Sequence, residues 1–228
     1  MKKLILPVLI VLILASSVFA QKGAKPWSEW SKDEVDKVLD KSAWGHVLTN
    51  TDTSEMTVTF GQASPIDGAK NQALSWSYRI RFFSAKPIRE AFARKVMLAN
   101  PGLKPQQLER FISGDYTESI VIAVTFESSD RRYLAAREEA FKLSTTEQLR
   151  NKVYLELKDG RRVELAEYAP PSDDGTGAKF VFPRLIEGKP FVADEKDVIR
   201  FQADFPNGVS FGYRFRVADM IYDGKLEY

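Results

Sequence analysis

Arginines alternate with aromatic and aliphatic residues in two segments of the chain. Arg79 and Arg81 do so in the stretch WSYRIRF, and Arg214 and Arg216 do so in the stretch GYRFRV. A guanidinium group binds a carboxylate or a phosphate through two parallel hydrogen bonds. These arginines are therefore candidates for an anion-binding site, for example a site for an acidic glycan.

A fifth arginine joins them if residues 198–217 form a β-hairpin. The apolar pattern then places Arg200 directly opposite Arg214, with Arg216 beside them. Like charges that face each other across a strand pair are unfavourable unless something neutralises them. We expect acidic residues of adjoining strands to do so, which is the common arrangement, and the alternative is an anionic ligand. All five arginines would share one surface if the strands of Arg79 and Arg214 were neighbours.

Residues 208–212 match the G-x-S-x-G pattern of serine hydrolases. That nucleophile elbow needs a strand before the serine, a helix after it and a partner histidine later in the chain. Ser210 instead opens an expected strand, and the only histidine, His46, lies far upstream. The pattern therefore does not predict a serine hydrolase.

Metal-binding patterns are weak in this sequence. With no cysteine and a single histidine, His46, the usual zinc sites are not expected, and His46 itself is expected in a loop or at a helix end. Carboxylates at 173–174 and 194–197 lack the spacing of a calcium-binding loop, and the segment PPSDDGTG is typical of a turn between strands. We predict no metal and no cofactor.

Residues 1–20 have the three regions of a secretory signal peptide. Lys2 and Lys3 precede an apolar run, and small residues lead up to Ala20. The run is shorter than the roughly 20 residues that a membrane helix needs, and Pro7 interrupts it. We expect cleavage after Ala20 and a secreted or periplasmic protein without a membrane span. A lipid anchor at the cleavage point is excluded, because no cysteine is present.

Charge and composition exclude one class of partner. The sequence has 33 basic and 31 acidic side chains, and loss of Lys2 and Lys3 makes these numbers equal. Nucleic-acid binding needs an excess of cations that neutralise phosphates, so we predict no nucleic-acid partner. Because the chain has no cysteine, its apolar residues, which make up 44% of the sequence, must stabilise the fold in an oxidising compartment.

A short helix is expected at residues 32–41. Ser31 is its predicted N-cap, Glu34 completes a capping box, and Trp30 and Val35 are spaced as a hydrophobic staple. Three tryptophans flank this helix, namely Trp27, Trp30 and Trp44. We expect their rings to be buried where the helix docks, rather than to form a platform on which sugars stack.

Strands and helices alternate in the first half of the mature chain. In residues 74–82 the aromatic and aliphatic side chains share one face of a strand, which we expect to be buried, and the arginines share the other face. Pro87 suits the first turn of a helix with a buried side formed by Ile88, Ala91, Phe92 and Val96. Residues 119–126 are apolar on both faces, which is typical of a central strand. The same periodicities predict a strand at 56–60, a helix after Pro105 and a helix at 131–141.

Short strands separated by glycine turns follow from residue 152 onward. In the first hairpin, a three-residue loop that ends at Gly160 pairs Leu155 with Val163 and keeps one face apolar. This register sets Glu156 opposite Arg162, which is a favourable pair of charges.

The second hairpin follows the same rule. A loop of residues 206–208 pairs Ile199 with Phe215 and Phe201 with Tyr213. In both hairpins the glycine is the third loop residue, where a type I turn followed by a left-handed residue favours it.

These elements predict an α+β fold. Residues 21–150 are expected to form a mixed part with helices packed on a sheet, and residues 151–228 an antiparallel, sandwich-like β-rich part. The sequence leaves open whether the two parts share one core.

Three functional hypotheses remain. The first is an exported, soluble, non-catalytic protein that binds a partner protein or an envelope component through its surface, because the common catalytic motifs are missing. The second is a carbohydrate or anionic-ligand binding module that uses Arg79, Arg81, Arg200, Arg214 and Arg216. The third is a glycan-active hydrolase with a carboxylate pair that only the fold would bring together. The sequence makes no prediction about the oligomeric state.

Overall fold

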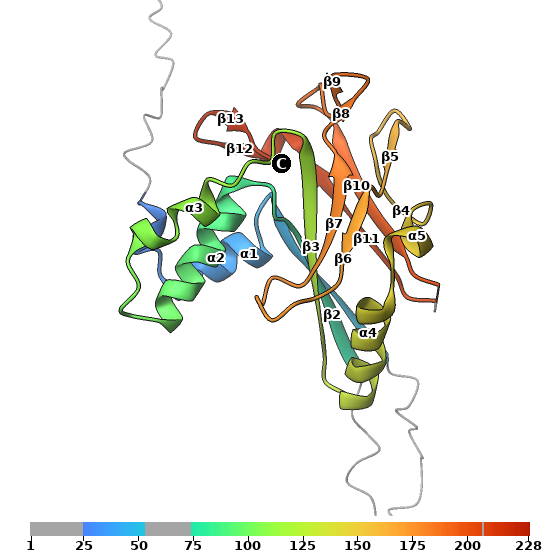
Figure 1. The fold of residues 1–228 in the computed structure, drawn as a ribbon, viewed down its shortest axis with the longest axis horizontal. Coiled ribbons are helices and arrows are strands. Elements are labelled where there is room, and N and C mark those ends of the chain that lie inside the picture. The colour runs from blue at the N-terminus through green and yellow to red at the C-terminus, as the bar shows by residue number, and fades with distance from the viewer. Residues whose placement is uncertain (1–24, 53–73, 207) are drawn as a thin grey trace, which may run out of the picture.

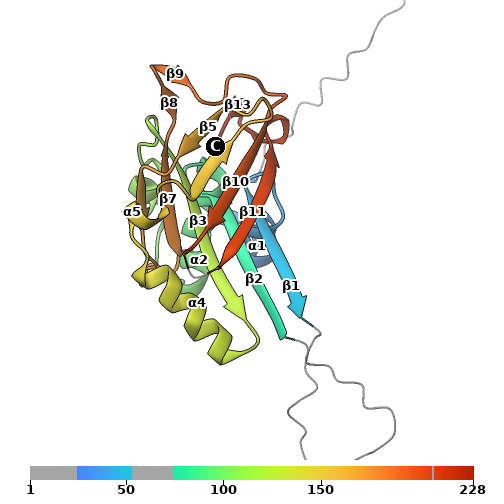
Figure 2. The ribbon, with the colours of Figure 1, turned by 90° about the vertical axis from the view of Figure 1, so that its right-hand side faces the viewer.

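The computed structural model describes residues 25–52, 74–206 and 208–228, which form an α+β fold (Figure 1). Two antiparallel sheets lie face to face, and a layer of helices covers the outer face of one of them (Figure 2). We call the five-stranded sheet sheet A and the four-stranded sheet sheet B. The predicted α+β class with a sandwich-like β-rich part is confirmed. The strand predicted at 56–60 lies outside the described residues.

Sheet A has the strand order β1-β2-β3-β7-β6. Its strands are β1 (Gly45–Asp52), β2 (Leu74–Phe82), β3 (Ser119–Ser128), β7 (Ala178–Pro183) and β6 (Glu167–Ala169). Strand β3 pairs with both β2 and β7, so it is central, as its two apolar faces predict. Sheet A thus combines strands that precede residue 150 with strands that follow it.

Sheet B has the strand order β11-β10-β4-β5. Its strands are β11 (Ser210–Arg216), β10 (Val198–Asp204), β4 (Val153–Glu156) and β5 (Arg162–Glu164). Both predicted hairpin registers are confirmed, with Leu155 opposite Val163 and Ile199 opposite Phe215.

The glycine turns of both hairpins also form as predicted. The backbone N–H of Gly160 donates to the carbonyl of Leu157 at 3.0 Å, and that of Gly208 donates to the carbonyl of Phe205 at 3.1 Å. Their φ angles are 88° and 81°, in the left-handed region that glycine adopts at little cost. The turn chemistry therefore fixes which face of each hairpin is apolar.

Short hairpins and helices complete the fold. The hairpins are β8 (Leu185–Ile186) with β9 (Lys189–Pro190), and β12 (Ile221–Tyr222) with β13 (Lys225–Leu226). The α-helices are α1 (Lys32–Asp40), α2 (Lys86–Ala99), α3 (Glu109–Ile112), α4 (Arg131–Leu143) and α5 (Thr146–Leu149). Single 3-10 turns occur at Trp27–Glu29, Pro105–Gln107 and Val217–Asp219.

Aromatic rings fill the space between the two sheets. Tyr78 of β2 stacks on Phe211 of β11, with ring centroids 4.2 Å apart, and Phe180 of β7 meets Phe201 of β10 at 5.5 Å. Helix α4 adds Phe141, whose ring centroid lies 4.9 Å from that of Phe205, the residue after β10. The strictly alternating aromatic residues of β2 therefore face the core, where such pairs stabilise the fold beyond the area they bury.

Helix α1 is positioned by the predicted capping box. The backbone N–H of Glu34 donates to the hydroxyl of Ser31, and the carboxylate of Glu34 accepts from the backbone N–H of Ser31 at 2.6 Å. Of the tryptophans beside this helix, Trp44 is buried and Trp30 packs partly against the core, whereas Trp27 is only partly buried, contrary to the prediction. The rings of Trp44 and Trp30 therefore dock the helix.

Helix α2 corrects one detail of the predicted buried side. Pro87 lies in its first turn, and Ile88, Ala91 and Phe92 are buried as expected. Val96 is instead 43% exposed. The first turns of the helix are buried and its last turns are mostly exposed. The apolar stripe that the sequence shows therefore ends on the surface at Val96.

Strand β1 was missed by the sequence reasoning, which placed His46 in a loop or at a helix end. His46 lies in this edge strand opposite Ile80, and its ring stacks on Tyr213 of β11 at 3.8 Å. Burial lowers the pKa of His46. The polar residues at 49–52 hide the alternating pattern, because an edge strand that is exposed on one side needs few apolar side chains.

The C-terminal segment is fastened to helix α2. The hydroxyl of Tyr222 donates to the buried carboxylate of Glu90, and the carboxylate of Glu227 accepts from the backbone N–H of Lys86 at 3.1 Å. Trp44 donates its indole N–H to the carbonyl of Glu227 at 2.7 Å. These contacts hold the hairpin β12–β13 beside the helical layer (Figure 1).

Candidate functional site

The five candidate arginines lie in two groups on opposite sides of the sandwich. Arg79 and Arg81 belong to β2 of sheet A, whereas Arg200, Arg214 and Arg216 belong to β10 and β11 of sheet B. The inner side chains of the two sheets contact each other, so the arginines that alternate with them point outward in opposite directions. The strands of Arg79 and Arg214 are not sheet neighbours, and a surface of five arginines does not form.

Arg79, in the group on sheet A, is fully engaged by carboxylates. Its Nε and Nη2 donate to the carboxylate of Glu127 on β3 at 3.1 and 2.9 Å, and its Nη1 donates to Asp40 at the end of α1. The hydrogen bonds from Arg79 lower the pKa of Glu127, which keeps that carboxyl group ionised. All three guanidinium nitrogens thus have acidic partners.

Arg81 is the buried member of the same group, with 4% of its surface exposed. Its Nη2 donates to Asp40 at 2.7 Å, its Nε donates to the carbonyl of Leu39 at 3.0 Å, and its Nη1 contacts the hydroxyl of Thr125 at 3.5 Å. Burial lowers the pKa of Arg81, and the ion pair with Asp40 opposes that shift. One aspartate therefore serves both arginines of sheet A.

A cleft of about 830 Å³ lies beside this group and is lined by residues of α1, β2 and β3. Six cationic side chains line it, namely Lys32, Lys37, Lys41, Arg79, Arg81 and Lys95. Four acidic side chains share the lining, namely Asp33, Asp36, Asp40 and Glu127. Because the fold already uses both arginines for ion pairs, a ligand anion would have to displace a carboxylate in order to reach them.

The group on sheet B is less completely neutralised. Arg200 contacts the carboxylate of Glu156 across β10 and β4 at 3.5 Å, and Arg162 donates to the same carboxylate at 2.7 Å. The hydrogen bond from Arg162, together with the nearby charge of Arg200, lowers the pKa of Glu156. One carboxylate therefore serves two arginines here, and Arg214 lies directly opposite Arg200.

Arg214 is exposed, and its side chain makes no ion pair or hydrogen bond with any residue in the described part of the chain. It lines a shallow hollow of about 320 Å³ together with Glu156, Leu157, Lys158, Val198 and Arg200. Arg216 is set apart from this hollow by its own ion pair with Asp219, at 2.6 Å. The hollow thus has three cationic side chains and one carboxylate, which Arg162 also uses.

Polar groups continue the same face of sheet B away from the hollow. Gln202 donates to Asp204 at 2.9 Å, and the hydroxyl of Ser210 donates to the same carboxylate at 2.5 Å. Ser210 opens strand β11, as predicted, so the G-x-S-x-G segment does not have the strand-turn-helix geometry of a nucleophile elbow. Its hydroxyl is part of a surface network.

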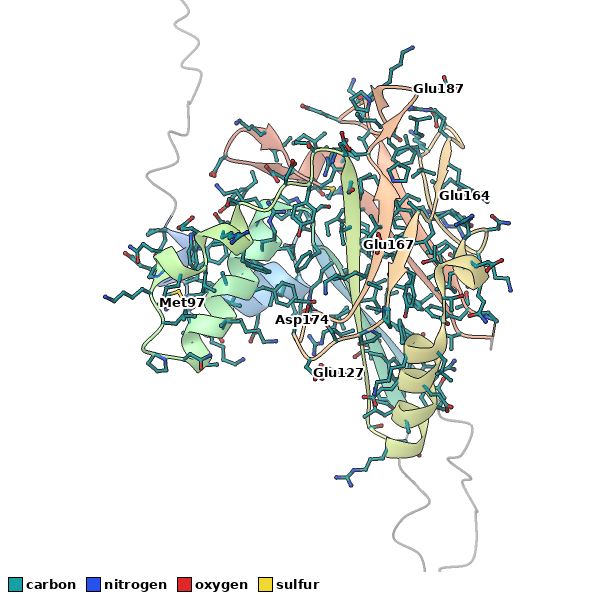
Figure 3. The ribbon with its side chains drawn as sticks, in the orientation of Figure 1. Met97, Glu127, Glu164, Glu167, Asp174 and Glu187 are labelled. Atoms are coloured by element: carbon teal, nitrogen blue, oxygen red, sulfur yellow. The ribbon has the colours of Figure 1, made fainter. Side chains whose placement is uncertain are left out.

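Glu127 and Glu164 illustrate the two sides of the sandwich. Figure 3 shows Glu127, the partner of Arg79, on the side of sheet A, and Glu164 of strand β5 on the side of sheet B. The sequence reasoning found the pair of Glu156 with Arg162, but it missed that Glu156 also serves Arg200 and that Asp40 serves the other group. No local pattern gives these partners, because strand order and helix docking bring them together.

Metal-ligating side chains do not gather in the part of the chain that the structure describes, where no three of them lie close enough together to hold an ion. Within the same residues, no helix has both the length and the apolar character needed to cross a bilayer.

No protein-family model and no curated protein matches the chain. Among solved structures, it is similar to a protein of unknown function from Burkholderia pseudomallei, with 10% sequence identity and a TM-score of 0.40. The similarity covers 60% of this chain and 72% of the other. A likeness at this TM-score carries no argument about function.

Proposed function

We propose that this is an exported, non-catalytic protein that binds a carboxylate-bearing partner, either an acidic protein or an acidic envelope component, through the outer face of sheet B. The observation that carries the proposal is the unmatched charge at the hollow beside β10 and β11. Arg200 and Arg214 face each other there, and the single lining carboxylate, Glu156, is shared with Arg162.

The cross-strand register supports an incoming anion. Two arginines that face each other across a strand pair repel unless a negative charge lies between or above them. A carboxylate of the partner that reached both guanidinium groups would relieve this repulsion and form charge-assisted hydrogen bonds. The shallow, exposed face suits a partner that lies across it better than a small molecule enclosed by it.

The non-catalytic part of the proposal is supported by the state of the acidic residues. A glycoside hydrolase needs one carboxyl group with a raised pKa as its acid, beside a second carboxylate in the same cleft. Burial raises the pKa of Glu90, but this residue packs against Tyr222 and Lys86 at the foot of α2. In the large cleft, Arg79 instead lowers the pKa of Glu127.

Export is proposed from residues 1–20, with cleavage after Ala20. The test is the intact mass of the protein recovered after expression of the full sequence in a bacterial host with a secretion pathway. A mass equal to that of a chain beginning at Gln21 supports the proposal. Recovery of the uncleaved chain from the cytoplasm contradicts it.

Binding is tested with two acidic polymers, polyglutamate and polygalacturonate, and with dextran as the neutral control. We expect saturable binding to at least one acidic polymer, weakened by salt because the contact is electrostatic and lies at the surface. The double variant Arg200→Ala with Arg214→Ala should bind roughly tenfold more weakly, since it loses two charge contacts.

Arg110→Ala is the matched control, because this exposed arginine of α3 lies outside sheet B. Its binding should equal that of the wild type. Failure of both polymers to bind at low salt would overturn the proposal, as would equal binding by the double variant. Cleavage of polygalacturonate by the purified protein would contradict the non-catalytic assignment.

A further inference from the structure

Strand β11 is an edge of sheet B in the described part of the chain, where it pairs only with β10. In an antiparallel pair, every second residue directs its backbone N–H and carbonyl groups to the partner strand, and the residues between direct them away. The N–H of Phe205 donates to the carbonyl of Val209 at 2.7 Å, and the N–H of Val217 donates to the carbonyl of Asp197 at 3.0 Å, so the odd-numbered residues of β11 bond to β10. The residues whose backbone groups point to the open edge are Ser210, Gly212, Arg214 and Arg216.

This edge lacks two features that commonly protect edge strands. A row of open backbone groups pairs readily with another strand unless a proline or a bulge interrupts it. The register of β11 with β10 runs without a bulge from Ser210 to Arg216, and the segment contains no proline. Its only charged side chains are Arg214 and Arg216, so a second copy of the chain would bring more arginines onto the same face. The charges therefore disfavour self-pairing and favour an acidic strand.

Sheet A extends one strand beyond this edge. Strand β11 lies over β2, because Phe211 stacks on Tyr78 at 4.2 Å and Phe215 meets Phe82 at 4.8 Å. Strand β1 is the next strand of sheet A beyond β2, and no described strand of sheet B lies over it (Figure 2). A strand added at the open edge of β11 would therefore lie over β1.

The inner side chains of β1 are only partly covered. His46 and Leu48 lie opposite Ile80 and Tyr78 of β2, and residues directly opposite each other share a face of the sheet. Ile80 and Tyr78 are buried, whereas His46 and Leu48 are half-buried, although the ring of Tyr213 stacks on that of His46. An added strand would bury the rest of both side chains, which favours its binding.

We propose that a partner protein adds an extended segment to sheet B as an antiparallel strand beside β11, with an acidic residue at every second position. This inference rests on the proposed function, because it takes the acidic partner to be a protein and states how it binds. The acidic side chains lie on the outer face, opposite Arg214 and Arg216, and the side chains between them are apolar and cover His46 and Leu48.

The parts of the chain outside the described residues do not supply such a strand. Residues opposite Arg214 and Arg216 are two positions apart, so two acidic residues with this spacing are needed. Residues 1–24 contain no acidic side chain. The acidic residues of segment 53–73 are Glu55 and Asp67, which are too far apart.

The test uses a peptide in which four glutamates and three valines alternate, so that it matches the seven residues of β11. Calorimetry on the mature chain should give a Kd below about 1 mM. In the proposed register the glutamates direct their backbone N–H groups to β11, and the valines direct theirs away. N-methylation of the two middle glutamates should therefore weaken binding at least about tenfold, whereas N-methylation of two valines, the matched control, should change it less than about threefold.

A pair of protein variants separates the backbone contact from the charge. Arg214→Ala keeps the N–H that points to the open edge, whereas Arg214→Pro removes it without removing a bond to β10. We expect Arg214→Pro to bind the peptide at least about fivefold more weakly than Arg214→Ala, with unchanged circular dichroism spectra for both. Amide hydrogen exchange gives a readout that needs no variant. The N–H groups of Gly212 and Arg214 should exchange rapidly in the wild type and slow down when the peptide binds.

The outcomes distinguish this inference from the proposed function. Binding of polyglutamate without binding of the alternating peptide would overturn the added strand alone, as would equal effects of the two methylations. Slow exchange of Gly212 and Arg214 before the peptide is added would show that the edge is already covered, and this would also overturn it. Failure of the peptide and of both acidic polymers to bind at low salt would overturn both proposals.

Discussion

The two outer faces of the sandwich differ in how far the fold satisfies their arginines. On sheet A, all three nitrogens of Arg79 donate to the carboxylates of Asp40 and Glu127. On sheet B, Arg200 shares a carboxylate with another arginine, and Arg214 has no acidic partner among the described residues. The two faces nevertheless use nearly the same stretch of sequence, which reads YRIR at residues 78–81 and YRFR at residues 213–216.

The difference comes from what covers each sheet. Helix α1 packs over sheet A and ends at Asp40, which places a carboxylate above β2. The outer face of sheet B has no helix over it in the described part of the molecule (Figure 2). An arginine beneath a helix layer must be neutralised, because it loses its hydration, whereas an exposed arginine keeps its water and is free to meet a partner. The same side chain is therefore structural on one face and available for binding on the other.

The largest effect is expected from Asp40→Ala. This change removes the acceptor of two arginines and leaves Arg81 buried with an unpaired charge, so the free energy of unfolding should fall by about 3–5 kcal/mol. Urea denaturation followed by tryptophan fluorescence measures it. The control is Asp36→Ala, whose ion pair with Lys32 is exposed and should contribute far less to stability. Equal costs for the two changes would break the comparison between the faces.

A smaller effect with a defined pH dependence is expected from Glu127→Gln. More than half of the Glu127 side chain is exposed, so its pair with Arg79 should contribute only about 0.5–1 kcal/mol at pH 7. Arg79 lowers the pKa of Glu127 below its ordinary value of 4.5. The contribution is therefore fully present above pH 4.5 and is lost as the pH falls through the lower folded-state value. Urea titrations of both proteins between pH 7 and pH 3 should show the difference disappear, and a difference that grew in acid would contradict this account.

Glu156→Gln should strengthen binding rather than weaken it. The change removes the one carboxylate that lines the hollow beside β10 and leaves Arg162 and Arg200 without an acidic partner there. Affinity for polyglutamate at low salt should rise about threefold, because a like charge is removed from the contact surface. The matched control is Glu164→Gln, which changes an exposed carboxylate of the same sheet outside the hollow and should alter affinity less. Weaker binding by Glu156→Gln would show that the acidic partner does not bind at this hollow.

The smallest effect is expected from Arg214→Ala on stability. The free energy of unfolding should change by less than about 0.5 kcal/mol, because the side chain is exposed and has no ion pair with the described residues. Arg216→Ala, which breaks the exposed pair with Asp219, should fall within the same limit. A loss above about 1 kcal/mol for Arg214→Ala would show that this arginine is structural, as on sheet A.

Local sequence predicted the elements well where periodicity and turn chemistry agree. The capping box of α1, the central strand β3 and both hairpin registers follow from a few residues each, because such signals act over a few positions. Strand β1 and the exposure of Val96 were missed. An edge strand needs little apolar alternation, and a helical stripe does not reveal where its neighbours end.

The candidate site was predicted only in part. The sequence named the five arginines and placed Arg200 opposite Arg214, but it gave no indication that Asp40 would neutralise the other face or that Glu156 would be shared. It also gave no sign that Arg89 would be buried, because the sequence pattern of a helix does not distinguish a buried arginine from an exposed one. Partners far apart in the chain come together only by packing, which leaves no spacing to detect.

The sequence by itself determined which face of each strand is buried and where the glycine turns lie. It also determined that the arginines of β2, β10 and β11 point away from the core. These properties follow from the two-residue period of a strand and from backbone conformations that single residues favour. Only the tertiary structure decided that the arginines of sheet A are covered and paired while Arg214 is left open. That outcome depends on which helix docks over which sheet, and docking is determined by the shapes of whole surfaces rather than by any local pattern.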